Sequence, residues 1–98
     1  MKNNYAFVNL AGVVLWSDAY KQKNGKYLHK YIVSVQDNVK KHNFHIISFD
    51  EKSSKPTYKK NDLIKINGTL KVNSFKDKNG EWKNEVYVQA KEIESLDE

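Results

Sequence analysis

The feature that most constrains this chain is a strict alternation of apolar and polar side chains from Leu63 to Phe75. The apolar residues of this run share even sequence numbers, namely Ile64, Ile66, Leu70 and Val72, with Gly68 among them. Lysine, asparagine and threonine fill the odd positions between them. A period of two is typical of a β-strand with one buried and one solvated face. We therefore expect a strand whose even positions face the core.

A hairpin is predicted directly after this strand. The sequence Asp77-Lys78-Asn79-Gly80 favours a turn, since Asn and Gly tolerate positive φ. The return strand keeps the same parity, with Val86 and Val88 at even positions. Phe75 is the exception, because it shares the lysine-bearing face rather than the core face. We expect it either to stack on a ligand beside positive charge or to pack on Trp82 at the hairpin tip.

Three further strands are predicted before this hairpin, at residues 5–16, 27–36 and 43–49. In the first of them, Gly12 is expected to mark a bulge or bend that lets one long strand serve two sheets. The stretch that follows the third strand contains Pro56, which argues against a helix through all of it. This pattern predicts an all-β fold, a five-stranded Greek-key OB-fold barrel with a short or absent helix between strands 3 and 4. An SH3-like barrel fits the same alternation.

The length of the chain, 98 residues, predicts one domain over residues 1–94, followed by a frayed end at residues 95–98. The absence of cysteine excludes disulfides and thiolate metal sites, and it suits a reducing compartment. The sequence contains neither a secretory signal nor an apolar run long enough to span a bilayer. We therefore expect a cytoplasmic protein that does not act on membranes.

Positive charge is concentrated ahead of the C-terminus. The formal net charge is +5, yet all 17 lysines and only eight of the twelve acids precede position 92, a balance of +9 for residues 1–91. Such a surplus favours a polyanionic partner such as nucleic acid or an anionic membrane. The basic residues are all lysine and none is arginine. An AT-rich genome would produce this bias without any selection for binding, so charge alone leaves the two explanations open.

No sequence pattern indicates catalysis or a bound cofactor. His42 and His45 are three residues apart on or beside a strand, so they point to opposite faces and make a poor metal pair. The sequence lacks a catalytic-triad pattern and a glycine-rich phosphate loop. We expect a binding protein that is not an enzyme and that needs no cofactor or metal.

Most of the chain resembles the single-stranded DNA-binding protein (SSB) family of bacteria and phages. Residues 8–14, Val-Asn-Leu-Ala-Gly-Val-Val, are similar to the family's Val-x-Leu-x-Gly-x-Val, and Tyr58 to Leu70 is similar to its Tyr-x-Lys-Gly-x-x-Val-x-Val-x-Gly-x-Leu. Residues 75–80, Phe-Lys-Asp-Lys-Asn-Gly, resemble its aromatic-x-Asp-x-x-Gly hairpin. The order and spacing of these motifs are more specific than any one of them. The resemblance implies an OB-fold that binds single strands by aromatic stacking and cationic contacts.

The resemblance also implies which aromatic residues contact a strand. By position, Phe75 matches a stacking aromatic on the hairpin, and Phe44 and Phe49 match the region of two more on the third strand. Two adjacent isoleucines leave the parity of that third strand open, so Phe44 and Phe49 are expected either in the core or on a stacking platform. Tyr87 is outward by parity and is expected to contact either a ligand or another subunit. A group of lysines is expected to follow a phosphate backbone, namely Lys21, Lys23, Lys26, Lys71, Lys76, Lys78 and Lys83.

The chain departs from the family at its end, Ser95-Leu96-Asp97-Glu98. Family members usually continue into a disordered linker and an acidic tip that recruits replication proteins, so we expect no recruitment through such a tip. A phage, plasmid or mobile-element version of the family is expected. The functional hypothesis is largely sequence-independent binding of single-stranded DNA, or alternatively RNA, by a homo-oligomer (dimer or tetramer) in replication or recombination. The competing hypothesis is an OB-fold protein-interaction adaptor, primosomal or other, with little affinity for nucleic acid.

Overall fold

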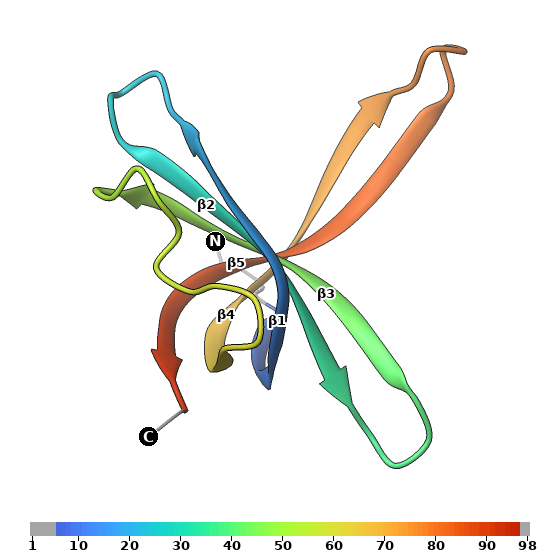
Figure 1. Ribbon diagram of the computed structural model, residues 1–98. Coiled ribbons are helices and arrows are strands. Elements are labelled where there is room, and N and C mark those ends of the chain that lie inside the picture. Colours follow the sequence, from blue (N-terminus) through green and yellow to red (C-terminus); the bar gives the residue numbers. More distant parts are fainter. Residues whose placement is uncertain (1–5, 97–98) are drawn as a thin grey trace, which may run out of the picture.

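The computed structural model describes residues 6–96, which form five strands and no helix. The strands close into a barrel in the order β1-β2-β3-β5-β4 (Figure 1). All neighbouring strands are antiparallel except β3 and β5, which pair in parallel through Ile46–Val88 and Ile47–Gln89. The five strands are β1 (Phe7–Lys21), β2 (Tyr27–Gln36), β3 (Lys41–Glu51), β4 (Leu63–Lys76) and β5 (Trp82–Ser95). The predicted fold class, a five-stranded OB-fold barrel, is confirmed.

Strand β1 belongs to two pairs, as its sequence predicted. Its first half pairs with β4 as far as Val13, and from Val13 onward it pairs with β2. Of the two features expected at Gly12, a bulge or a bend, the bulge is absent, since Gly12 pairs in regular register with Ile64. Glycine is required there for a different reason, because a Cβ at position 12 would lie 2.2 Å from the Ser34 carbonyl oxygen. The two strands cross too closely at this point for any side chain.

The irregularity in β1 comes three residues after Gly12, at Leu15. Val14 pairs with Val33 and Trp16 pairs with Ile32, so Leu15 is an extra residue on β1. A bulge of this kind reverses the parity of every later residue in the strand. Trp16 is therefore turned to the outer face of the barrel. The strand also continues to Lys21, five residues beyond its expected end at residue 16. Tyr5, the expected first residue, lies outside the described residues.

The core is small and comes from all five strands. Its buried residues are Val14, Tyr31, Val33, Ile46, Ile64, Ile66 and Val88. The parity expected for β4 holds for Ile64 and Ile66, which are both fully buried. On β3 the even-numbered Ile46 and Ser48 are buried and Phe44 packs against the core, which resolves the ambiguous parity of that strand. The odd-numbered residues of β3 therefore face outward.

The outer part of the β4–β5 hairpin projects away from the barrel, and we call its residues 71–87 the arm (Figure 1). The prediction that Val72 and Val86 face the core is wrong, because they are 60% and 52% exposed. They still face each other across the hairpin in regular register. The alternation of side chains continues beyond Leu70, but there the strand has left the barrel. Even and odd positions therefore lie on the two exposed faces of the arm.

Residues 52–62 cross from β3 to β4 without a helix and cover one end of the barrel. Side chains from the strands attach this segment to the core. The Thr57 backbone N–H donates to the Tyr31 hydroxyl at 3.2 Å, and His29 Nε2 lies 2.8 Å from the Ser53 carbonyl oxygen. In turn, the Tyr58 hydroxyl donates to the Ile93 carbonyl at 3.0 Å. The first two of these hydrogen bonds satisfy backbone groups of the segment that a helix would otherwise pair.

Two of the four residues expected to form a frayed end, Ser95 and Leu96, are held in place by backbone hydrogen bonds. Ser95 still belongs to β5 and pairs with Ile64, and the backbone N–H of Leu96 donates to the Leu63 carbonyl at 2.9 Å. Both residues are therefore held by the barrel. Asp97 and Glu98, the remaining residues of that prediction, lie outside the described residues.

Candidate nucleic-acid interface

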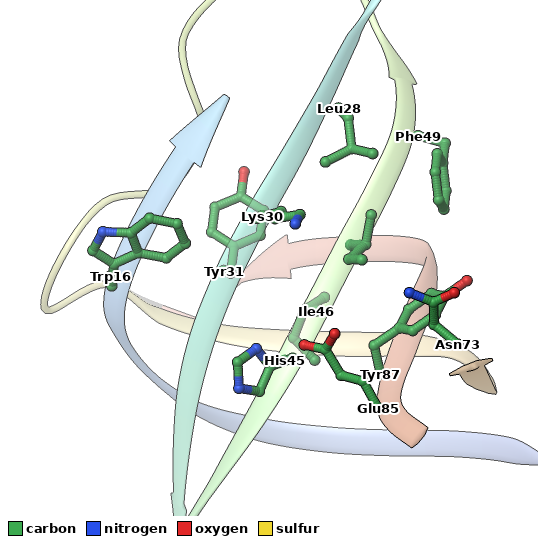
Figure 2. A pocket seen from close by; sticks show the side chains of 11 residues that line it. Trp16, Leu28, Lys30, Tyr31, His45, Ile46, Phe49, Asn73, Glu85 and Tyr87 are labelled. Atoms are coloured by element: carbon green, nitrogen blue, oxygen red, sulfur yellow. The ribbon is translucent and has the colours of Figure 1, made fainter. Parts of the chain in front are cut away.

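An open hollow of about 310 Å³ lies between the outer face of the barrel and the arm (Figure 2). Its lining includes Trp16 from β1, Lys30 from β2, His45 and Phe49 from β3, and Asn73, Glu85 and Tyr87 from the arm. A second hollow of about 440 Å³ continues toward the β1–β2 hairpin through Tyr20 and Ile32, and shares Trp16, Lys30, His45 and Glu85 with the first. We call the two hollows together the aromatic groove. Each is at the lower end of the range for small-ligand sites, roughly 300–1,000 Å³.

Three local features of the chain aim aromatic side chains into this groove. The bulge at Leu15 turns Trp16 outward, and Tyr20 follows on the same face because it pairs with Leu28 in regular register. The outward parity of β3 places Phe49 on the same side as His45. The outward parity of β5 does the same for Tyr87. Four aromatic rings thus come from three strands that are distant in sequence.

The aromatic groove combines flat rings with positive charge. The Nζ of Lys30 lies 5.4 Å from the centroid of the Tyr20 ring, within cation–π range. Partial burial and the nearby Asp18 carboxylate raise the pKa of Tyr20, and burial raises the pKa of Tyr31. Both phenols therefore stay neutral at pH 7. Tyr20 offers its ring face and hydroxyl group to a ligand, while the charge comes from lysine. Tyr31 is only 2% exposed, and its hydroxyl already accepts from the Thr57 backbone N–H.

Two of the four predicted aromatic residues line the groove, namely Phe49 and Tyr87. Phe44 does not, because it pairs with the buried Val33 and packs against the core. The placement of Phe44 on a stacking platform is thereby corrected. Phe75 lies outside the hollow itself but shares the arm face of Asn73 and is 42% exposed. It extends the groove toward the tip of the arm.

The alternative position for Phe75, packed on Trp82, does not occur. Phe75 pairs with Lys83, whereas Trp82 pairs with Lys76, so the two aromatic rings lie on opposite faces of the arm. The Nζ of Lys76 lies 5.4 Å from the Trp82 ring centroid, on the face away from the groove. Trp82 is therefore held beside a lysine rather than beside Phe75.

The predicted lysines fall into three groups. Lys71 and Lys83 share the arm face of Tyr87 and Phe75, although the Lys83 ammonium also lies 3.8 Å from Asp77 and 3.7 Å from Glu81. Three more lie at the tip of the β1–β2 hairpin, which borders the second hollow, namely Lys21, Lys23 and Lys26. Lys76 is on the opposite face of the arm, and Lys78 is in its turn. The structure therefore brings only part of the predicted set to the groove.

Several groove residues were not predicted from the sequence: Trp16, Tyr20, Lys30, His45, Asn73 and Glu85. Tyr20 carried a usable signal, since it adjoins Lys21 and large aromatics beside lysines are typical of single-strand sites. The bulge at Leu15 determines that Trp16 and Tyr20 lie on the outer face of the barrel, and no residue type in the sequence predicts this bulge. Asn73 and Glu85 carried no signal, because polar residues are the normal occupants of a solvated face.

No protein-family model matches the sequence, and no curated protein matches it. Solved structures do match. The SSB of Plasmodium falciparum, solved in complex with ssDNA, has a TM-score of 0.82 at 14% identity, with 99% of both chains covered. The chain therefore shares its fold with that SSB. The mitochondrial single-stranded DNA binding protein Rim1 of S. cerevisiae has a TM-score of 0.72 at 15% identity, with 96% of this chain and 97% of that chain covered. At these identities the similarity concerns the fold alone.

Within residues 6–96, no group of three or more metal-ligating side chains comes together. His42 instead lies 2.7 Å from an Asp37 carboxylate oxygen. Within the same range no helix is long and apolar enough to cross a membrane.

Proposed function

We propose that this protein binds single-stranded DNA along the aromatic groove, largely without regard to sequence and without chemistry of its own. The observation that carries the proposal is the convergence of Trp16, Tyr20, Phe49 and Tyr87 in one open groove with lysines at its margins. Stacking of bases on aromatic rings is tolerant of sequence because every base has a π-face. The fold supports the same function, since one structure that shares it was solved in complex with ssDNA.

The mode of binding follows from the distribution of rings and charges. Bases would enter the groove and stack on rings such as Phe49 and Tyr87, with Phe75 extending the platform along the arm. The sugar–phosphate backbone would run along the margins, close to Lys30, to Lys71 and to the lysines of the β1–β2 tip. A duplex has its bases already stacked and paired, so it cannot use the rings.

The biological role that fits such binding is protection or organisation of exposed strands in replication or recombination. We place this role in the bacterial cytoplasm, in a phage-, plasmid- or mobile-element-encoded protein. We further propose that the protein acts as a homo-oligomer. On the side away from β4, residues 8–12 of β1 have no strand partner within the described part of the chain, since β2 joins only at Val13. An open edge of this kind can pair with the same edge of a second copy.

The binding proposal is tested by fluorescence anisotropy of a labelled thymine oligonucleotide titrated with the protein at low salt. Saturable binding of the single strand, with much weaker binding of a matched duplex, is the expected result. An RNA strand of equivalent sequence, as competitor, measures the preference between DNA and RNA. Equal affinity for single strand and duplex, or no binding of the single strand, would overturn the proposal.

A protein-interaction adaptor remains the second candidate function, and one observation favours a protein contact. The face of the arm away from the groove exposes Val72, Trp82 and Val86, and Trp82 is 69% exposed. Clustered exposed apolar side chains mark protein contacts more often than nucleic-acid contacts. The two functions use opposite faces of the arm. If the adaptor function alone is correct, the anisotropy titration gives no single-strand binding.

A further inference from the structure

Asn73 and Glu85 face each other directly across the arm, and both side chains line the aromatic groove (Figure 2). Glu85 also lines the second hollow, so its carboxylate borders both halves of the groove. Among the described residues, neither side chain takes part in a hydrogen bond or an ion pair within the chain. A carboxylate on the His45 side and an amide on the Tyr87 side, both unengaged, thus lie among the rings that would receive bases (Figure 2).

A carboxylate at this place is unfavourable for part of a nucleic acid. Phosphate and carboxylate repel each other, so a strand in the groove turns its phosphates toward Lys30 and away from Glu85, both of which line the two hollows. The group that enters beside Glu85 is therefore a base. An ionised carboxylate only accepts hydrogen bonds, with two oxygens, whereas the Asn73 amide can also donate two. The pair consequently selects a base edge that offers donors to Glu85 and an acceptor to Asn73.

We propose that Asn73 and Glu85 form a subsite that prefers guanine within the single-strand groove, an inference that rests on the proposed function. In a single strand the Watson–Crick edge is free to be read. The edge of guanine presents the O6 acceptor, then the N1–H donor, then the N2 amino donor. Both donors can be accepted by the two oxygens of Glu85, while O6 accepts from the Asn73 amide.

The other bases fit this pair less well. Thymine places the carbonyl oxygens O4 and O2 on either side of its single N3–H donor, so at least one carbonyl faces the carboxylate. Cytosine and adenine each offer one amino group beside a ring-nitrogen acceptor, and therefore one hydrogen bond to Glu85 instead of two. Tyr87, two residues from Glu85 on the same face of β5, supplies the ring on which the selected base stacks. The preference for guanine at this subsite adds to a stacking interaction that any base can make.

The test compares three strands of equal length by anisotropy: all-thymine, thymine with isolated guanines, and the same strand with inosine in place of guanine. Isolated guanines avoid quadruplex formation. We expect the guanine strand to bind about fivefold more tightly than the all-thymine strand, the lower end of the range for a bidentate base contact. Inosine lacks the N2 amino group, so its strand should lie between the two.

Two variants assign the preference to its residues. Glu85→Gln replaces one accepting oxygen with a donating amide nitrogen, and we expect it to bring the guanine-to-thymine affinity ratio close to one. Glu81→Gln removes a carboxylate from the turn of the arm, outside the groove, and should keep the wild-type ratio. Equal affinity of the wild type for all three strands, or an unchanged ratio in Glu85→Gln with a native melting curve, overturns the guanine subsite. Failure to bind any strand instead overturns the proposed function.

Discussion

Phe75 and Trp82 lie on opposite faces of the arm, although only six residues of chain separate them. Both rings are exposed, Phe75 by 42% and Trp82 by 69%, and neither belongs to the core. Phe75 shares the face that continues into the aromatic groove, and Trp82 does not. The two residues therefore form a natural pair of test and control for single-strand stacking.

The first prediction concerns this pair. Phe75→Ala should weaken single-strand binding by about 1–3 kcal/mol, because it removes one stacking ring. Trp82→Ala should leave the affinity nearly unchanged, since its ring faces away from the groove. Melting temperatures should stay close to the wild type in both variants, because neither ring is buried. Anisotropy titrations and thermal melts of the two proteins measure all four quantities.

Ile66→Ala is the fold control for the same experiment. Ile66 is fully buried, so its truncation should destabilise the protein by about 2–5 kcal/mol. Its single-strand affinity should be native at temperatures where the protein is folded. The stacking role of Phe75 fails if Phe75→Ala lowers the melting temperature as Ile66→Ala does, or if Trp82→Ala loses as much affinity.

The second prediction separates the two phenylalanines of β3. Phe49→Ala should weaken strand binding by about 1–3 kcal/mol with little change in stability. Phe44→Ala should do the reverse and lower the free energy of unfolding by up to about 3 kcal/mol, less than a fully buried ring would. Denaturant unfolding and anisotropy on both variants decide the matter. A loss of affinity in folded Phe44→Ala would contradict its placement in the core.

The third prediction concerns ionic strength. With about four to six phosphate contacts, the slope of log affinity against log salt should be about −3 to −4, at roughly 0.7 per contact. Lys71→Gln should make this slope shallower, since Lys71 shares the arm face of Tyr87. Lys76→Gln serves as the control, because Lys76 lies on the other face over Trp82. An affinity that does not change with salt would exclude a phosphate contribution.

The fourth prediction concerns assembly. Pairing of the free β1 edges of two copies should give a dimer or tetramer, with a mass two or four times the 11.5 kDa of the chain. Light scattering coupled to gel filtration at micromolar concentration measures this mass. A mass of one chain under these conditions contradicts the prediction.

The fifth prediction is a pH dependence at the β2–β3 turn. Hydrogen bonds from the backbone N–H groups of Lys40 and Val39, and then from His42, lower the pKa of Asp37 from 3.8 to about 2. Because the folded-state pKa lies below the unfolded value, the stabilisation is fully present above about pH 4 and is lost as the pH falls toward 2. The stability of Asp37→Ala should lack this component of the pH dependence, which acid unfolding of the variant and the wild type measures. NMR titration of the wild type measures the pKa of the Asp37 carboxyl group directly. A carboxyl pKa near 4 in the folded protein would contradict it.

The sequence predicts the fold better than the site for identifiable reasons. Strand β2 and the glycine turns follow from local chemistry, and Gly25 and Gly80 do adopt positive φ. The face of Trp16 depends on the bulge at Leu15, which is a property of the β1–β2 pair rather than of any residue. The alternation of apolar and polar residues along β4 correctly predicted that Ile66 is buried. It could not predict the residue at which β4 leaves the barrel. Val72 obeys the same alternation as Ile66 and is nevertheless exposed.

The site residues were harder to predict because the groove is assembled from separate strands. Phe49 and Tyr87 were predicted from resemblance and parity, and the structure brings both to one hollow. Glu85 could not be found in the same way, since a glutamate on an outward face normally contacts water. Only the three-dimensional arrangement of the strands shows that Glu85 lines the groove.

The arm has a consequence for the thermodynamics of binding. Residues 71–87 are paired only with each other, and all of them except Asp77 and Tyr87 are exposed, so the barrel does little to fix the angle at which they project. A two-stranded ribbon of this kind samples many orientations at little cost in energy. A strand seated between the arm and β3 would restrict that motion, and the lost conformational entropy would offset part of the stacking enthalpy. Under the proposed function, the groove would thereby adapt to bases of different size at the expense of net affinity.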